Sequence, residues 1–208
     1  MLRKHYYWSP DGVHLAYFSF NGHVLTLNIA GTDGATPRSL TKTKVLPEAP
    51  EWSRDGRRIV FSGKDSKNEA VFLINADGSG KTRLTDPKLH ASSPSWSPDG
   101  KHIVFTGVIH DKAQVYMIND DGSGVRQLTH DKKIECWTDA WIEESNLLLL
   151  QCGQLSNDSY SGIKHLNLFT LAADDPNGRP SPLTTDGAIG MSIARIRDAK
   201  APSPEKSR

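Results

Sequence analysis

Trp96-Ser97-Pro98-Asp99-Gly100 is one of four related stretches in this chain. Close copies begin at Trp8 and Trp52, and a decayed copy begins at Trp141, so successive tryptophans are 44, 44 and 45 residues apart. Recurrence at a period of about 40–45 residues indicates a repeat architecture. Each tryptophan precedes a tight turn on a short extended run, which predicts packing between neighbouring repeats.

Two further markers run in phase with the tryptophans. An Asp-Gly pair recurs at residues 33–34, 77–78 and 121–122, and Asn177-Gly178 takes its place in the fourth copy. A Leu-Thr pair closes every unit, at residues 40–41, 84–85, 128–129 and 183–184. Three markers in phase over four copies establish the repeat.

One unit contains the signals of four short strands. Its apolar segments are β-branched or aromatic, too short for helices, and separated by turn residues. In the second copy the extended segments are 49–52, 58–62, 70–74 and 82–85, with turns at 53–56 and 77–78. Four antiparallel strands in about 44 residues are typical of a propeller blade.

The sequence therefore predicts an all-β fold. We expect a β-propeller-like array of four four-stranded antiparallel blades, of about 44 residues each, plus one extra C-terminal strand. The propeller repeats occupy residues 1–197, with blades at 5–41, 48–85, 92–129 and 136–184, the extra strand at 189–196, and a disordered tail at 198–208. Three arrangements stay open: closure as a small propeller, two chains pairing into an eight-bladed ring, or part of a longer propeller.

The repeat pattern P-x-W-S-P-D-G, followed by I-V-F, N-x-D-G-S-G and L-T, resembles the TolB-type (WD-like) propeller repeat over roughly residues 5–185. The resemblance implies a propeller fold. It does not imply one activity, because that family spans periplasmic adaptors, peptidase accessory domains and some lyases.

Composition excludes several classes of function. The 208 residues include 25 Lys and Arg and 24 Asp and Glu, a net charge of +1, which argues against a nucleic-acid footprint. No apolar run approaches the roughly 20 residues that span a bilayer, so we expect no membrane insertion. No signal peptide is visible; the resemblance favours the periplasm, whereas Met1 as the true start would favour the cytoplasm.

Topology separates two faces of the array. The Ser-Pro-Asp-Gly and Asp-Gly turns share one face, and the variable loops and blade-to-blade connectors share the other, where binding is expected. The candidate ligand-binding residues on the variable face are His90, His110, Asp111, Lys112, His130, Asp131, Trp137 and Tyr160. No cofactor is predicted, but His90, His110 and His130 are candidates for a divalent metal site with Asp111 or Asp131. The alternative interpretation is that these are ordinary solvated loop residues.

The leading functional hypothesis is a non-enzymatic binding or scaffold propeller that engages a protein or small polar ligand through this face. One alternative is a metal-assisted propeller lyase or hydrolase, in which Lys64, Lys112, Lys132 and Lys133 hold a carboxylated carbohydrate. A serine hydrolase is excluded by the lack of a G-x-S-x-G segment. The last alternative is an oligomerising propeller fragment without a ligand, for example a homodimer that completes a larger ring.

Cys136 and Cys152 lie on the first and second predicted strands of the fourth unit. The repeat register places Cys136 opposite Gly153, with the two thiols on opposite faces of the sheet, and so predicts reduced cysteines. A slip of one residue would reverse that arrangement.

Overall fold

A computed structural model describes residues 6–20, 24–43, 50–65, 68–142, 145–155, 163–175 and 177–185. These residues form four separate four-stranded antiparallel sheets, each made of strands in sequence order. Within these ranges there is no helix, and so none that could cross a membrane. The predicted all-β array of four blades is confirmed. The predicted strand at 189–196 and tail at 198–208 lie outside the described residues.

Each sheet follows the same plan, with short first and last strands around two longer ones. The first sheet contains β1 (Tyr6–Trp8), β2 (His14–Phe20), β3 (Leu25–Gly31) and β4 (Arg38–Thr43). The second contains β5 (Glu51–Trp52), β6 (Arg58–Lys64), β7 (Glu69–Asn75) and β8 (Thr82–Arg83). The third contains β9 (His90–Trp96), β10 (His102–Ile109), β11 (Lys112–Asn119) and β12 (Arg126–Gln127). The fourth contains β13 (Glu135–Trp141), β14 (Leu147–Leu155), β15 (Ile163–Ala172) and β16 (Ser181–Pro182).

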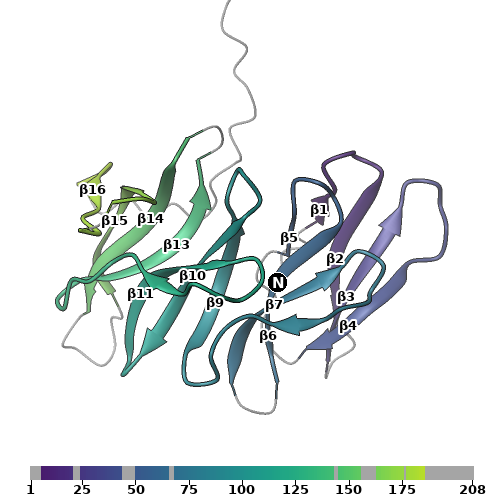
Figure 1. Cartoon of the computed structure of the whole chain (residues 1–208), viewed down its shortest axis with the longest axis horizontal. Helices are drawn as coiled ribbons and strands as arrows, with labels where there is room; N and C mark the ends of the chain where they lie inside the picture. Colours follow the sequence, from purple (N-terminus) through teal and green to yellow (C-terminus); the bar gives the residue numbers. More distant parts are fainter. Residues whose placement is uncertain are drawn as a thin grey trace, which may run out of the picture.

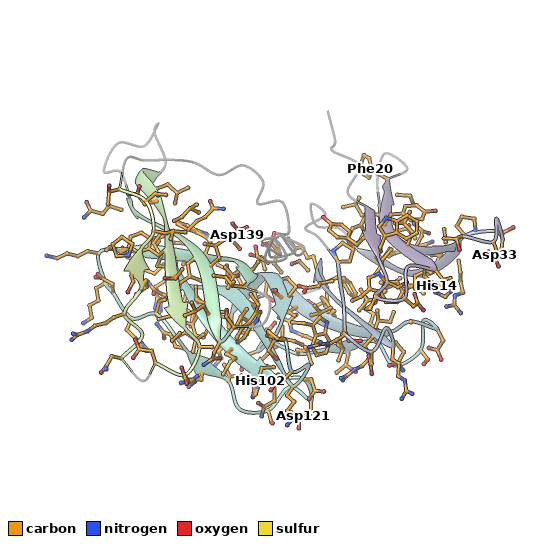
Figure 2. The ribbon with its side chains drawn as sticks, turned by 90° about the horizontal axis from the view of Figure 1, so that it is seen from above. His14, Phe20, Asp33, His102, Asp121 and Asp139 are labelled. Atoms are coloured by element: carbon orange, nitrogen blue, oxygen red, sulfur yellow. A yellow bond between two sulfur atoms is a disulfide. The ribbon has the colours of Figure 1, made fainter. Side chains whose placement is uncertain are left out.

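The four sheets follow one another in an arc (Figure 1). The first sheet, in purple, lies at one end, and the fourth, in green and yellow, lies at the other. The view turned by 90° shows the same separation of the two end sheets (Figure 2). Over the described residues the arc is therefore open.

The Ser-Pro-Asp-Gly turn is held together by its own side chains. Ser97 Oγ donates a hydrogen bond to Asp99 Oδ1 at 2.5 Å and accepts one from the backbone N–H of His102 at 2.9 Å. The N–H of Gly100 reaches the carbonyl of Ser97 at 2.9 Å, and Gly100 has a φ of 69°, which glycine adopts without strain. The first and second sheets repeat the arrangement around Ser9 and Ser53. The sequence forms this turn because serine and aspartate satisfy the backbone locally.

Apolar side chains of adjacent sheets form the core between blades. Trp96 of the third sheet packs with Val60 and Val71 of the second sheet. Trp52 packs in the same way against Ala16 and Leu27 of the first sheet. The predicted packing role of these two repeat tryptophans is confirmed.

The prediction of reduced cysteines is wrong. Cys136 pairs directly with Cys152 across β13 and β14, and the two sulfurs form a disulfide. The physical reason is a β-bulge: the register shifts between Thr138 and Ala140, which leaves Asp139 as an extra residue on β13. That shift brings the two cysteines to the same face of the sheet.

Candidate functional site

The connections between strands fall on two faces, as the topology requires. The turns after the first and third strands of each sheet lie on one face, which we call the turn face. The loops after the second strands and the connectors between blades lie on the other, which we call the variable face. In Figure 2, His14 and Phe20 mark the two ends of β2, on the turn face and the variable face respectively.

Carboxylates on the turn face are engaged in holding the turns. The hydrogen bond from Ser97 lowers the pKa of Asp99, and equivalent bonds from serine lower the pKa values of Asp11 and Asp55. In the Asp-Gly turns, Ser79 and Ser123 donate to Asp77 and Asp121 and lower their pKa values in the same way. These five turn-face carboxylates thus already have partners within their own turns.

The second blade braces its variable-face loops with buried polar groups. Arg83, at the end of β8, donates to Asp65 Oδ2 and to Asn68 Oδ1, both at 2.6 Å. The same guanidinium donates to the carbonyl of Thr85 at 2.8 Å. Asn68 is buried and donates onward to the carbonyl of Pro87. One arginine therefore links the inner loop of this blade to the connector that follows it.

The third blade uses an amide for the same purpose. Gln114, buried on β11, donates to the carbonyls of Asp131 at 3.0 Å and Ile134 at 2.9 Å. Gln114 Oε1 accepts from Thr129 Oγ1, which in turn accepts from the N–H of Val115 at 3.0 Å. Hydrogen bonds to Gln114 thus hold the connector from 129 to 134 in place. A loop that is already ordered loses little conformational entropy on binding.

The predicted site residues are exposed but dispersed over this face. His90 is the first residue of β9, and His130 lies in the connector to the fourth blade. His110 and Asp111 form the tip of the β10–β11 hairpin, with φ values of 49° and 59°. Lys112 is also exposed, and the side chains of these five residues make no hydrogen bond or ion pair to the part of the chain that the structure describes.

The other predicted residues have different surroundings. Asp131 Oδ1 accepts from the N–H of Lys133 at 2.7 Å, so one of its oxygens stabilises the connector. Trp137 is half-buried on β13, opposite Gln151. Tyr160 lies outside the described residues.

The structure does not gather the three histidines into a metal site. Among the residues it describes, no three His, Cys, Asp or Glu side chains are placed to hold a metal ion. Divalent metal binding and the metal-assisted lyase activity stay predictions.

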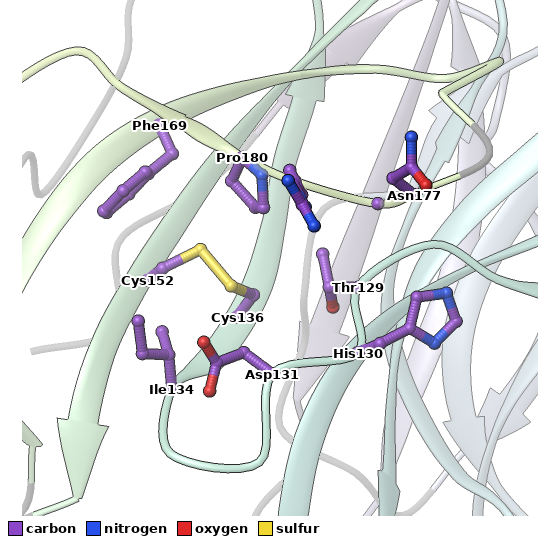
Figure 3. A pocket seen from close by; sticks show the side chains of 11 residues that line it. Thr129, His130, Asp131, Ile134, Cys136, Cys152, Phe169, Asn177 and Pro180 are labelled. Atoms are coloured by element: carbon purple, nitrogen blue, oxygen red, sulfur yellow. A yellow bond between two sulfur atoms is a disulfide. The ribbon is translucent and has the colours of Figure 1, made fainter.

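A hollow of about 460 Å³ lies between the third and fourth blades (Figure 3). Its wall contains the disulfide and the apolar side chains of Ile134, Phe169 and Pro180. Its polar lining consists of Thr129, His130, Asp131, Asn177 and Arg179. In Figure 3 the Asp131 carboxylate turns toward Ile134, whereas the His130 ring points away from the disulfide. His130 and Asp131 are thus the two predicted residues that the structure brings to one hollow.

Sequence reasoning missed the far wall of this hollow, because that wall comes from the widened outer turn of the fourth blade. The turn folds back until Gly178 lies against the carbonyl of Leu128; a Cβ atom on Gly178 would lie 1.8 Å from that oxygen. The one available signal was the Asn177-Gly178 pair in the Asp-Gly slot, which marks a turn but not its tertiary contact.

Comparison with known proteins assigns the repeat. The family model of the TolB beta propeller domain matches residues 6–171. No curated protein sequence matches the chain.

Among solved structures, a putative TolB from Agrobacterium tumefaciens is 22% identical with a TM-score of 0.69, covering 85% of this chain and 63% of that chain. TolB from Acinetobacter baumannii is 20% identical with a TM-score of 0.66, covering 86% of this chain and 43% of that chain. An oligogalacturonate lyase in complex with manganese is 12% identical with a TM-score of 0.61, covering 88% of this chain and 53% of that chain. The chain thus spans less than two thirds of each structure, and likeness at these identities shows the fold alone.

Proposed function

Because the chain belongs to the TolB β-propeller family, we propose that it is a non-enzymatic binding module whose variable face engages an acidic partner, either a protein segment or a small polar ligand. The observation that carries this proposal is the set of exposed basic and imidazole groups, among them Lys112, His130 and Lys132, on variable-face loops that buried side chains hold in place.

The third blade offers the best-defined part of that surface. Lys112 begins β11, two residues from the buried Gln114 that holds the carbonyl of Asp131. Lys132 is the next residue of the same connector and is exposed. The hairpin tip and the connector therefore present Lys112 and Lys132 from one rigid support. Positive groups that are held in place favour a carboxylate-bearing partner, with a strong dependence on salt.

A binding measurement with two defined probes tests the proposal. We would follow a fluorescently labelled glutamate-rich peptide, and separately an oligogalacturonate, by anisotropy or calorimetry at low salt. The double substitution Lys112→Ala/Lys132→Ala is expected to weaken binding roughly fivefold, since each exposed charge pair contributes only about 0.2–1 kcal/mol. Added salt should weaken binding of the wild-type chain.

The matched control is Arg57→Ala/Lys101→Ala, which removes two exposed positive charges from the turn face. It lowers the net charge equally and should leave the affinity unchanged. An equal loss in both double variants would mean that net charge alone attracts the probe. Failure of both probes to bind the wild-type chain would also contradict the proposal.

We further infer that the chain works in an oxidising compartment. The observation in support is the Cys136–Cys152 disulfide, since such bonds persist in the periplasm and outside cells and are rare in the cytosol. This agrees with the periplasmic expectation from the family resemblance. Alkylation of both cysteines in the natively isolated chain, without prior reduction, would contradict the inference.

A further inference from the structure

The hollow between the third and fourth blades has a filled counterpart one repeat earlier. On the first two strands of the third blade, Ala91 and Gly107 pair with each other at the repeat positions of Cys136 and Cys152. The ring of Tyr116 lies against Gly107, since a Cβ atom on that glycine would lie 2.7 Å from the ring. Tyr116 is 8% exposed, and it packs in the cluster that joins the second and third blades. Between those blades the ring therefore fills the space beside the two small residues.

The disulfide changes this arrangement in the fourth blade. Phe169 occupies the repeat position of Tyr116, but it is only partly buried. Its ring cannot lie over Cys152 as the ring of Tyr116 lies over Gly107, because the cysteine side chain takes up that space. The hollow of about 460 Å³ is the space that remains beside the disulfide.

Both walls of the hollow come from described parts of the chain. One wall is the connector that carries Asp131, and the other is the outer turn that carries Asn177 and Pro180 (Figure 3). The disulfide packs with Val104 and Leu128 of the third blade, so it lies on the face of the fourth sheet that looks toward that blade. Blades added at either end of the arc would therefore leave the hollow as it is.

Two groups of opposite charge line the hollow without pairing with each other. Among the residues that the structure describes, the guanidinium of Arg179 makes no hydrogen bond or ion pair. Asp131 uses one carboxylate oxygen to accept the N–H of Lys133, and its other oxygen has no hydrogen bond or ion pair to the described residues. The hollow thus combines an apolar wall with one positive and one negative group.

The two charged groups are carried by turns that are already held in place. Gln114 donates to the carbonyl of Asp131 at 3.0 Å. On the other wall, the carboxylate of Asp175 accepts the backbone N–H groups of Asn177 at 2.8 Å and Arg179 at 3.2 Å. Both oxygens of Asp175 are thus engaged by the backbone, which leaves the side-chain donors of Arg179 for a ligand. Groups that are positioned before binding lose little entropy when the ligand arrives.

We propose that this hollow binds a small zwitterion with an apolar body, of the class of the larger apolar amino acids. The ligand's ammonium group lies at Asp131, its carboxylate lies at Arg179, and its side chain packs on Ile134, Phe169 and the disulfide. An acid alone would bring a carboxylate beside Asp131, and an amine alone would bring an ammonium group beside Arg179, whereas a zwitterion gives each charge its partner. The volume is within the range of small-molecule sites. The site needs no acidic partner and stands independently of the function proposed above.

Calorimetry on the full chain with three related probes tests the proposal. L-Phenylalanine carries both charges, phenylpropionate lacks the ammonium group, and phenethylamine lacks the carboxylate. L-Phenylalanine is expected to bind about fivefold more tightly than either of the other two, as one further exposed charge pair provides. Equal binding of all three probes would overturn the proposal, and so would a wild-type chain that does not bind L-phenylalanine at millimolar concentration.

Two substitutions assign the charges to their partners. Arg179→Gln is expected to weaken the binding of L-phenylalanine and phenylpropionate about fivefold but not that of phenethylamine. Asp131→Asn is expected to weaken the binding of L-phenylalanine and phenethylamine but not that of phenylpropionate, and it retains an oxygen for the N–H of Lys133. This crossed pattern distinguishes direct contact from a general loss of structure, which would affect all probes alike.

The preceding connector offers a matched control. Asp86 is exposed and accepts the N–H of Lys88 at 2.7 Å, as Asp131 accepts that of Lys133. Asp86→Asn therefore removes the same charge from an equivalent turn, and Arg57→Gln removes an exposed arginine from the turn face. Both should leave the affinity for L-phenylalanine unchanged. Losses in these controls as large as those of the site variants would overturn the proposal, as would L-phenylalanine binding that survives both Arg179→Gln and Asp131→Asn.

Discussion

A single pairing of side chains recurs at the tightest points of the molecule. Aspartate two residues after serine accepts both the serine hydroxyl and a backbone N–H, as Asp55 does from Ser53 and Arg57. These bonds favour the ionised carboxylate and lower the pKa of Asp55 below its usual 3.8. The turn needs both the serine hydroxyl and the aspartate carboxylate to bond its backbone. The motif therefore recurs in the sequence wherever this turn forms.

Replacement of Asp55 tests that role through pH. Because the folded chain holds the pKa below the value in the unfolded chain, the stabilisation is complete above about pH 5 and is lost as the pH falls through the folded pKa. The difference in unfolding free energy between the wild type and Asp55→Asn should thus be largest near neutrality and shrink below 3.8. Urea titrations at several pH values would measure it. A difference for Asp55→Asn that stays constant at every pH would contradict the assignment.

At the scale of elements, the strands and turns could be predicted from sequence, but the pairing register could not. The second copy was expected to have strands at 58–62 and 70–74, and they extend over Arg58–Lys64 and Glu69–Asn75. The prediction that Cys136 lies opposite Gly153 was wrong, because a bulge in the first strand of the fourth blade shifts the register by one residue. The third blade has a bulge at the same place, around Ser93 and Pro94. Proline cannot donate to the ladder, so Pro94 was a usable signal for that bulge, but the fourth copy has Asp139 in its place.

The disulfide that follows from the bulge should contribute measurably to stability. It closes a loop with a sequence separation of 16, for which loop-closure entropy gives about 3 kcal/mol. Cys136→Ala/Cys152→Ala is expected to lower the unfolding free energy by about that amount, measured by urea denaturation. Dithiothreitol should destabilise the wild type similarly and leave the double variant unchanged. Insensitivity of the wild type to the reductant would show that the bond is absent.

At the scale of the whole molecule, neighbouring blades are joined by polar contacts as well as apolar ones. Thr106 Oγ1 accepts from the N–H of Thr138 at 2.9 Å, which links the second strand of the third blade to the first strand of the fourth. Ser62 Oγ accepts from the N–H of Ser93 at 3.1 Å between the second and third blades. Ser62 and Thr106 occupy the same position of successive repeats. At each of these two interfaces the hydroxyl accepts a hydrogen bond from a backbone N–H of the next blade.

Removing that hydroxyl should loosen one interface selectively. Thr106→Val keeps the shape of the side chain but leaves the N–H of Thr138 without its acceptor, at an expected cost of about 1–3 kcal/mol. Thr106→Ser retains the accepting oxygen, so its loss of unfolding free energy should be much smaller than that of Thr106→Val. Thermal or urea unfolding of the two variants provides the comparison. Equal destabilisation by valine and serine would assign the effect to packing instead.

For the candidate site, the sequence predicts which face of the molecule the residues lie on, but not which of them lie together. Topology placed His110, Lys112 and His130 on the variable face, because the second-to-third loops and the connectors must share one end of the strands. The hollow beside His130 depends on Gly178 meeting the carbonyl of Leu128, fifty residues away in sequence. No local pattern reports such a contact, and the exposure of Trp8 and Leu183 likewise depends on which neighbours are present.

Each sheet is assembled from four consecutive strands, and this has a consequence for how the chain folds. Among the described residues every strand pairing is made within one repeat, so a blade can form as soon as its own segment has left the ribosome. Each new blade then adds to the one before it, as in other repeat proteins whose units contact only their neighbours. Short loops to close favour rapid folding for an all-β chain. The order of synthesis along the chain is thus also the order in which the arc grows.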